Sequence, residues 1–145
     1  MEASGPEGER TIKATDFFKG LFETALGSQD VLVAIRVPAA TVQTRVGFAE
    51  LARRHGDYAI VGLAASARAD GKGLADVRLA YFGVGATPVR AKKSEAALTK
   101  GDVDGAVAAL DLEPQDDVQA TGVVKKHLAG VLLRRVAAQL MEART

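Results

Sequence analysis

The sequence predicts an α+β fold in which a three-stranded antiparallel sheet carries C-terminal helices packed on one face. Two observations indicate this class. Two apolar, alternating segments flank a glycine-bearing turn, Asp70-Gly71-Lys72-Gly73, which predicts a β-hairpin. The C-terminal segment places apolar side chains at intervals of four, which predicts an amphipathic helix that covers the sheet.

Length and composition limit the classes of protein that the chain can form. The 145 residues suffice for one ordinary domain, and 48% of them are hydrophobic. The core must consist mostly of Ala, Val and Leu, because the chain has five Phe, two Tyr and no Trp. Nineteen basic and 18 acidic residues leave a net charge of +1, so nothing indicates a nucleic-acid partner. The absence of Cys excludes disulfides and thiolate metal sites.

The N-terminal residues 1–10 are polar and contain glycine and proline, so we expect them to be disordered. They have neither the basic end nor the apolar stretch of a signal peptide. No apolar run approaches the ~20 residues of a membrane-spanning helix. The sequence therefore predicts a cytoplasmic protein without a membrane span.

The first elements are short. Thr15 can cap a helical turn that Gly20 ends. The β-branched residues 31–37, closed by Pro38, predict the first strand of the sheet. Residues 48–54 have the apolar spacing of a short amphipathic helical turn.

The hairpin supplies the other two strands, at residues 58–69 and 74–85. In the second of these strands, three apolar side chains alternate with polar or small ones: Val77, Leu79 and Tyr81. This period of two predicts one buried and one exposed face. In the first strand, one face carries small residues, which leaves room for another element to lie against it.

Helices are expected in the remainder of the chain. Ser94 can cap a short helix, and a second one starts near Asp102. Asp116 or Asp117 opens the longest helix. A metal site is the less favoured interpretation of these two aspartates, because two neighbouring carboxylates are too few ligands for a cation. Five apolar side chains of this last helix are expected to face the sheet: Val124, Leu128, Leu132, Val136 and Leu140.

Few side chains are arranged for catalysis. His55 and His127, the only two imidazoles, lie in no triad or metal-ligand spacing, so we predict no catalytic residue and no metal site. Arg53 and Arg54 form either a phosphate clamp or a solvated pair at the end of a turn. Tyr58 follows a glycine turn and is placed either to lay its ring on a planar ligand or to pack in the core.

Four motifs occur in order along the chain: residues 16–38, residues 53–62 with the Gly56-Asp57-Tyr58 turn, residues 82–91 with Gly83-Val84-Gly85, and residues 120–135. Together they resemble the C-terminal part of the FAD-binding (medium) subunit of carbon monoxide dehydrogenase and related molybdenum hydroxylases, including xanthine dehydrogenase. The resemblance covers about residues 9–140. It implies the fold of a carbon monoxide dehydrogenase flavoprotein C-terminal domain.

The resemblance also implies a division of the chain. Residues 11–38 resemble the tail end of a flavin domain, and residues 39–145 the flavoprotein C-terminal domain. The glycine-rich loops that hold the FAD pyrophosphate in such subunits belong to domains without a counterpart here. The chain is therefore expected to be a truncated or split flavoprotein component that binds FAD together with the missing domains or a partner chain. It is not expected to be an active enzyme alone.

In such complexes the flavoprotein passes electrons from iron–sulfur clusters to an acceptor, so the implied partners are the iron–sulfur and molybdenum-cofactor subunits. The resemblance places Tyr58 beside the isoalloxazine ring, Asp57 and Arg54 in the same loop, and Leu32 as an apolar contact on the preceding strand. The sequence departs from the family pattern in two places: Glu50 replaces a frequent lysine, and the pair Val124-Lys125 replaces a tyrosine–arginine pair. The alternative function is a non-catalytic, stand-alone interaction module or a degenerate remnant of that subunit.

Overall fold

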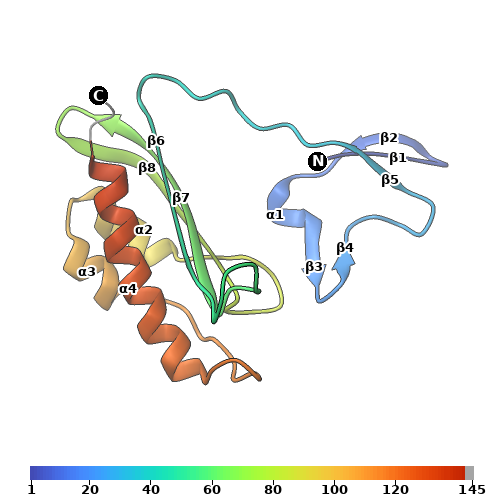
Figure 1. Cartoon of the computed structure of the whole chain (residues 1–145). Helices are drawn as coiled ribbons and strands as arrows, with labels where there is room; N and C mark the ends of the chain where they lie inside the picture. Colours follow the sequence, from blue (N-terminus) through green and yellow to red (C-terminus); the bar gives the residue numbers. More distant parts are fainter. Residues whose placement is uncertain (143–145) are drawn as a thin grey trace. The chain divides into compact units, whose positions relative to one another are not determined.

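The computed structural model describes residues 1–142, which belong to two compact units, Met1–Ala40 and Thr41–Thr145. Each unit has its own strands (Figure 1). Each also has its own cluster of buried apolar side chains. Among the described residues, no helix has the length and apolar character needed to cross a bilayer.

The first unit is built from short elements. A three-stranded antiparallel sheet has the order β2-β1-β5, and a two-stranded ribbon pairs β3 with β4. The elements are β1 (Glu2–Gly5), β2 (Gly8–Thr11), α1 (Ala14–Phe17), β3 (Phe18–Gly20), β4 (Glu23–Thr24) and β5 (Val31–Ala34).

The N-terminal residues differ from the disorder that their composition predicts, because they form the β1–β2 hairpin. The N-terminal ammonium of Met1 donates to the carbonyl of Ile12 at 2.9 Å, and the amide of Ile12 donates back to Met1. Ala3 is buried against Ile12 and Phe17. Every residue of β2 is exposed, so its composition resembles that of a disordered segment. The strand is nevertheless ordered, because its backbone pairs with β1.

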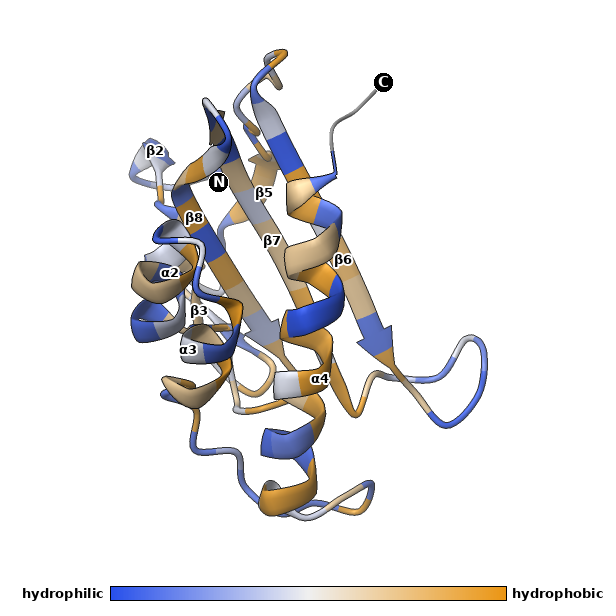
Figure 2. Ribbon diagram, turned by 90° about the vertical axis from the view of Figure 1, so that its left-hand side faces the viewer, coloured by the Kyte–Doolittle hydropathy of each residue, from blue (hydrophilic) through white to orange (hydrophobic). Residues whose placement is uncertain are grey.

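The second unit is a four-stranded antiparallel sheet with helices on one face (Figure 2). Its strands lie in chain order: β6 (Thr44–Leu51), β7 (Val61–Asp70), β8 (Gly73–Phe82) and β9 (Val89–Arg90). Its helices are α2 (Lys92–Thr99), α3 (Val103–Ala108) and α4 (Gly122–Met141). Helix α4 lies against β6 and β7, α2 lies against β8, and α3 packs on both helices. The predicted α+β class with C-terminal helices on one face is confirmed.

The hairpin forms as predicted, with Gly71 in the left-handed region at φ 58°. Val77, Leu79 and Tyr81 of β8 are at most 6% exposed, as the alternation requires. Strand β7 begins at Val61 rather than at residue 58, so the first three residues of the predicted strand belong to the preceding loop.

The position predicted for the first strand of the sheet is wrong, although the strand itself forms. Residues 31–34 form β5, which pairs with β1 in the first unit. The strand beside β7 is β6, where the sequence predicts a helical turn. So short an apolar pattern does not distinguish a helix from a strand, whereas pairing with β7 does. Gly47 also permits close approach of α4, since a Cβ there would lie 2.9 Å from Cγ1 of Val136.

Helix α4 begins later than predicted. Thr121 caps it by accepting from the amide of Val124, and Asp116 accepts from the amide of Gly122 at 2.7 Å. Of the five predicted core side chains, Leu132, Val136 and Leu140 are fully buried, Leu128 is half-buried, and Val124 is 47% exposed. A spacing of four drifts by about 40° per step around a helix of 3.6 residues per turn, so five such positions cannot share one face.

The two shorter helices are held in place by different kinds of contact. Asp102 caps α3 by accepting from the amide of Gly105 at 2.7 Å, as predicted. Ser94 does not cap α2; its buried hydroxyl donates to the carbonyl of Ala106 at 2.7 Å and joins α2 to α3. Glu95 accepts from the amide of Leu79 and so joins α2 to the sheet.

Tyr81 provides a test of this core. Its side chain is fully buried, and its hydroxyl donates to the carbonyl of Ala129 in α4 at 3.1 Å. We expect Tyr81→Ala to lower the free energy of unfolding by about 3–5 kcal/mol, measured by urea denaturation. The neighbouring Phe82→Ala, on the half-exposed opposite face, should cost less than half of that. Equal losses would contradict the assignment of the two faces.

Candidate functional site

Three of the four predicted site residues lie in one loop, residues 52–60, which joins β6 to β7 and is called the Tyr58 loop below. The amide of Ile60 donates to the carbonyl of Leu51 at 2.7 Å and closes the base of the loop. Gly56 adopts φ 81°, a conformation that favours glycine, and turns the chain just before Asp57 and Tyr58. The glycine turn singled out in the sequence is therefore a real turn.

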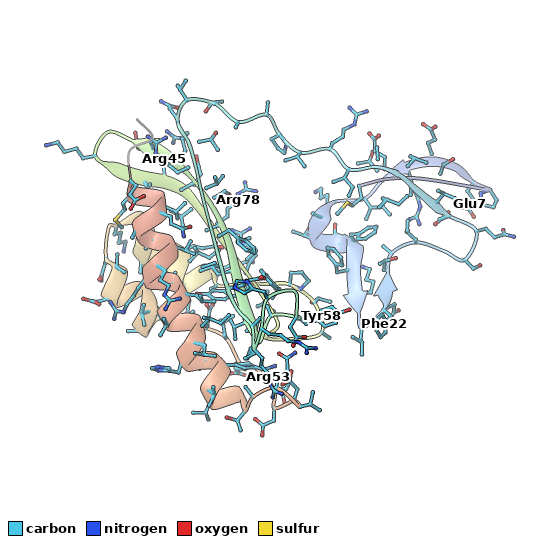
Figure 3. The ribbon with its side chains drawn as sticks, in the orientation of Figure 1. Glu7, Phe22, Arg45, Arg53, Tyr58 and Arg78 are labelled. Carbon is cyan, nitrogen blue, oxygen red and sulfur yellow. The ribbon has the colours of Figure 1, made fainter. Side chains whose placement is uncertain are left out.

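Tyr58 is 87% exposed, so the core-packing interpretation of this residue is wrong. Its backbone amide donates to Oδ1 of Asp57 at 3.0 Å, while Oδ2 of Asp57 pairs with Nε of Arg54 at 3.4 Å. Figure 3 shows Tyr58 and Arg53 at the same end of the second unit. The loop thus presents an aromatic ring to solvent beside an arginine whose charge is partly balanced.

Leu32, the fourth predicted residue, lies in β5 of the first unit. It stands opposite Ala3 and packs, half-buried, against the cluster of Ala3, Ile12 and Phe17. A local turn brings the three loop residues together, whereas Leu32 belongs to the other compact unit.

Arg53 anchors the Tyr58 loop to the segment before α4. Its guanidinium donates to the carbonyls of Val118 and Gln119 at 2.9 and 3.0 Å. Arg54 is paired with Asp57 instead, so the two arginines point to different partners and do not form a shared phosphate clamp. The phosphate clamp and the solvated pair both follow from the adjacency of the two arginines in the sequence. Adjacency does not reveal that Arg53 meets carbonyls contributed by residues far along the chain.

Lys125 is a buried cation that the sequence interpretation missed. Its side chain is 5% exposed, and Nζ donates to the carbonyl of Gly83 at 2.9 Å and to Oδ2 of Asp117 at 2.6 Å. A signal was present, because Lys125 precedes the buried Ala129 and Leu132 by four and seven residues and so lies on the buried stripe of α4.

Asp117 organises a turn, residues 117–120, called the Asp117 turn below. Its Oδ1 accepts from the amides of Gln119 and Ala120 at 2.9 and 3.1 Å. Of the two aspartates predicted to open the last helix, Asp117 therefore does not do so, whereas Asp116 does, together with Thr121. The hydrogen bond from Lys125, followed by those from the two amides, lowers the pKa of Asp117 to about 2.

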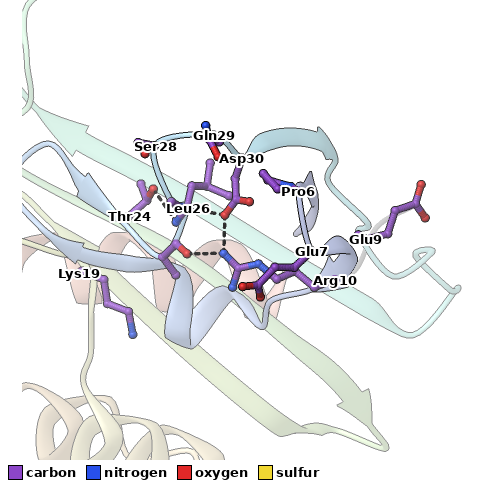
Figure 4. A pocket seen from close by; sticks show the side chains of 13 residues that line it. Pro6, Glu7, Glu9, Arg10, Lys19, Thr24, Leu26, Ser28, Gln29 and Asp30 are labelled. Atoms are coloured by element: carbon purple, nitrogen blue, oxygen red, sulfur yellow. Dashed lines mark hydrogen bonds and ion pairs between the residues drawn. The ribbon is translucent and has the colours of Figure 1, made fainter.

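A hollow in the first unit is lined by residues 6–10, 19 and 24–30 (Figure 4). Its central groups are Arg10 and Asp30, which pair at 2.6 Å. Arg10 also donates to the carbonyl of Ala25, and Asp30 accepts from the amide of Gly27 at 2.7 Å. This amide, together with Arg10, lowers the pKa of Asp30. The pair is satisfied within the unit, so we assign no ligand to the hollow.

The two imidazoles are both exposed, His55 in the Tyr58 loop and His127 on α4. Within residues 1–142, no three His, Asp or Glu side chains gather as metal ligands do.

Comparison with known proteins identifies the class. The CO dehydrogenase flavoprotein C-terminal domain matches residues 47–140, from within β6 almost to the end of α4. The chain belongs to this family, which confirms the resemblance read from the four motifs.

Individual relatives extend the match into the first unit. The carbon monoxide dehydrogenase medium chain of Hydrogenophaga pseudoflava is 34% identical over 138 residues, which are 90% of this chain and 48% of that protein. The glyceraldehyde dehydrogenase medium chain of Sulfolobus acidocaldarius is 37% identical over 92 residues, 63% of this chain and 32% of that protein. The chain spans about half the length of the carbon monoxide dehydrogenase relatives that it matches.

Solved structures agree with these matches. Carbon monoxide dehydrogenase from Hydrogenophaga pseudoflava superposes with a TM-score of 0.89 at 34% identity, over 96% of this chain and 51% of that one. Quinoline 2-oxidoreductase from Pseudomonas putida superposes with a TM-score of 0.84 at 29% identity, over 97% and 51% of the two chains.

The exposure of Tyr58 makes a prediction about stability. Because its ring contributes little to the core, we expect Tyr58→Ala to change the free energy of unfolding by no more than about 0.5 kcal/mol. Urea denaturation followed by far-UV circular dichroism would measure this. A loss of several kcal/mol would mean that the ring is packed rather than presented.

The pairing of Asp117 predicts a dependence of stability on pH. The folded-state pKa of about 2 lies below the ordinary value of 3.8, so the stabilisation is fully present above pH 3.8 and is lost as the pH falls toward 2. In Asp117→Asn, which cannot ionise, the free energy of unfolding should fall less steeply between pH 5 and 2.5 than in the unmodified chain. Parallel profiles from urea denaturation at each pH would show that the pair contributes nothing.

Proposed function

We propose that this chain contributes one wall of the FAD site of a carbon monoxide dehydrogenase-type molybdenum hydroxylase, and thereby takes part in electron transfer from iron–sulfur clusters to an acceptor. The observation that carries this proposal is the exposed ring of Tyr58 on a turn of a CO dehydrogenase flavoprotein C-terminal domain. An exposed aromatic ring has no role in the core of its own unit and is suited to stacking on a planar ligand.

The residues of the Tyr58 loop fit a flavin. Tyr58 would lie against the isoalloxazine ring, and the Arg54–Asp57 pair beside it would supply a donor and an acceptor for the polar edge of that ring. Leu32 would supply an apolar contact. FAD, when bound, supplies the capacity to take up and release electrons; these residues would orient the ring and limit its contact with water.

The second unit does not supply every group that FAD requires. A helix N-terminus is the usual cradle of a pyrophosphate, but at α4 its first amides already donate to Asp116 and Thr121. We therefore propose that other polypeptide holds the pyrophosphate, since the chain spans about half the length of its carbon monoxide dehydrogenase relatives.

The proposed partners are an iron–sulfur subunit and a molybdenum-cofactor subunit, and the proposed location is the cytoplasm. The solved carbon monoxide dehydrogenase from Hydrogenophaga pseudoflava lacks the Mo-pyranopterin moiety of the molybdenum cofactor, and this link to a molybdenum cofactor supports the second partner. The nearly balanced charge of +1 gives no support for a nucleic-acid partner.

The second candidate function is a non-catalytic interaction module or a remnant of the flavoprotein. It is favoured by the core of the second unit, which is built from its own strands and helices and needs no cofactor to fill it.

Flavin titration distinguishes the two functions. The full chain would be mixed with the half of the Hydrogenophaga medium chain that it does not match, and FAD binding followed by flavin fluorescence. We expect saturable binding that Tyr58→Ala weakens by about tenfold, as loss of a stacked ring does, while Tyr58→Phe retains it.

A matched control is Val123→Ala, which removes another exposed side chain, 82% accessible, from α4. It should leave FAD binding unchanged. If the unmodified chain never retains FAD in this mixture, the interaction module becomes the better function.

A further inference from the structure

Each end of the Tyr58 loop is held by a segment that contacts the same buried ammonium group. At the first end, Arg53 donates to the carbonyls of Val118 and Gln119. These two carbonyls belong to the Asp117 turn, whose shape is set by the two amides that donate to Asp117. Oδ2 of Asp117 then accepts from Nζ of Lys125 at 2.6 Å.

The second end of the loop is held through Gly83. This residue has φ 76°, and a Cβ on it would lie 2.7 Å from the carbonyl oxygen of Ile60 and 3.0 Å from that of Ala59. The backbone at Gly83 is thus packed directly on the last residues of the loop. The carbonyl of Gly83 accepts from Nζ of Lys125 at 2.9 Å.

A closed ring of contacts results: from Lys125 through Gly83 to Ile60, along the Tyr58 loop to Arg53, and through the Asp117 turn back to Lys125. Both ends of the loop are therefore linked to one ammonium, in addition to the hydrogen bond between Ile60 and Leu51 that closes its base.

Docking of α4 does not explain why this position carries a charge. Leu132, Val136 and Leu140 bury the helix on the sheet without it. A buried ammonium pays for desolvation and is often no more stabilising than an apolar residue of the same volume. Two directed hydrogen bonds, however, specify the positions of two acceptors, which an apolar side chain cannot do.

We propose that Lys125 and Asp117 are positioning residues that hold the Tyr58 loop in the geometry that faces the flavin. This inference rests on the proposed function of Tyr58. Neither side chain touches the cofactor in this scheme; they act through Gly83 and Arg53. If loss of the ring of contacts leaves the loop in its ordered form one tenth of the time, the apparent Kd for FAD rises about tenfold.

The test uses the full chain and compares Lys125→Met with Lys126→Met. Both substitutions remove one positive charge from the same turn of α4, but Lys126 is exposed whereas Lys125 is buried. Backbone order parameters from nitrogen-15 relaxation report the loop directly. For residues 54–58 we expect them to fall from about 0.85 to below about 0.6 in Lys125→Met and to stay unchanged in Lys126→Met.

Arg53→Ala is the second variant, in case the loss of Lys125 prevents folding. Arg53 is exposed, so its removal leaves the core intact while it releases the first end of the loop. The same increase in mobility is expected. A loop that stays rigid in Arg53→Ala and in folded Lys125→Met would overturn the inference.

FAD titration in the mixture described above completes the test. In the mobile variants we expect a Kd about tenfold higher, with less quenching of flavin emission by Tyr58, and no change in Lys126→Met. A mobile loop with unchanged Kd and quenching would overturn the positioning role. Failure of the unmodified chain to bind FAD would sink the proposed function instead, while the order parameters would still decide whether Lys125 orders the loop.

Discussion

Burial of one face of the β7–β8 hairpin beneath α4 and α2 is the constraint on which the second unit depends. Val61 and Leu63 on one strand, and Leu79 and Tyr81 on the other, are all inaccessible to solvent. Because side chains alternate along a strand, burying this set fixes the register of the hairpin. The Tyr58 loop leads into β7, so its starting point is set by the same packing.

The outer face of this sheet has a different character from the inner one. Phe48 and Phe82 stack with their ring centroids 6.0 Å apart, and the ring of Phe82 lies over Gly62 so closely that a Cβ there would be 1.9 Å from it. Glycine at this position lets an aromatic ring shield the backbone near the start of β7. Apolar packing thus stiffens the strand, while polar contacts to carbonyls order the loop that precedes it.

The family and the site loop were predictable from the sequence because both rest on local features. The hairpin turn, the alternation in β8 and the glycine before Asp57 and Tyr58 are each contained within a few residues. The partner of β5, and the helical turn expected where β6 lies, were predicted wrongly for the opposite reason. Short apolar segments of either period can form a strand when a neighbour offers an edge, and the edges of β1 and β7 lie outside the segments from which the predictions were made.

By itself, the sequence determined the α+β class, the hairpin and the last helix, since periodicity and turn chemistry depend on neighbours along the chain. Membership of the flavoprotein family followed from the resemblance of its four motifs. Only the tertiary structure decided that Tyr58 is exposed, that Arg53 and Arg54 have separate partners, and that Lys125 is buried between Gly83 and Asp117. Burial and hydrogen-bond partners arise when distant segments meet. A buried lysine and an exposed lysine have the same side chain and differ only in their surroundings.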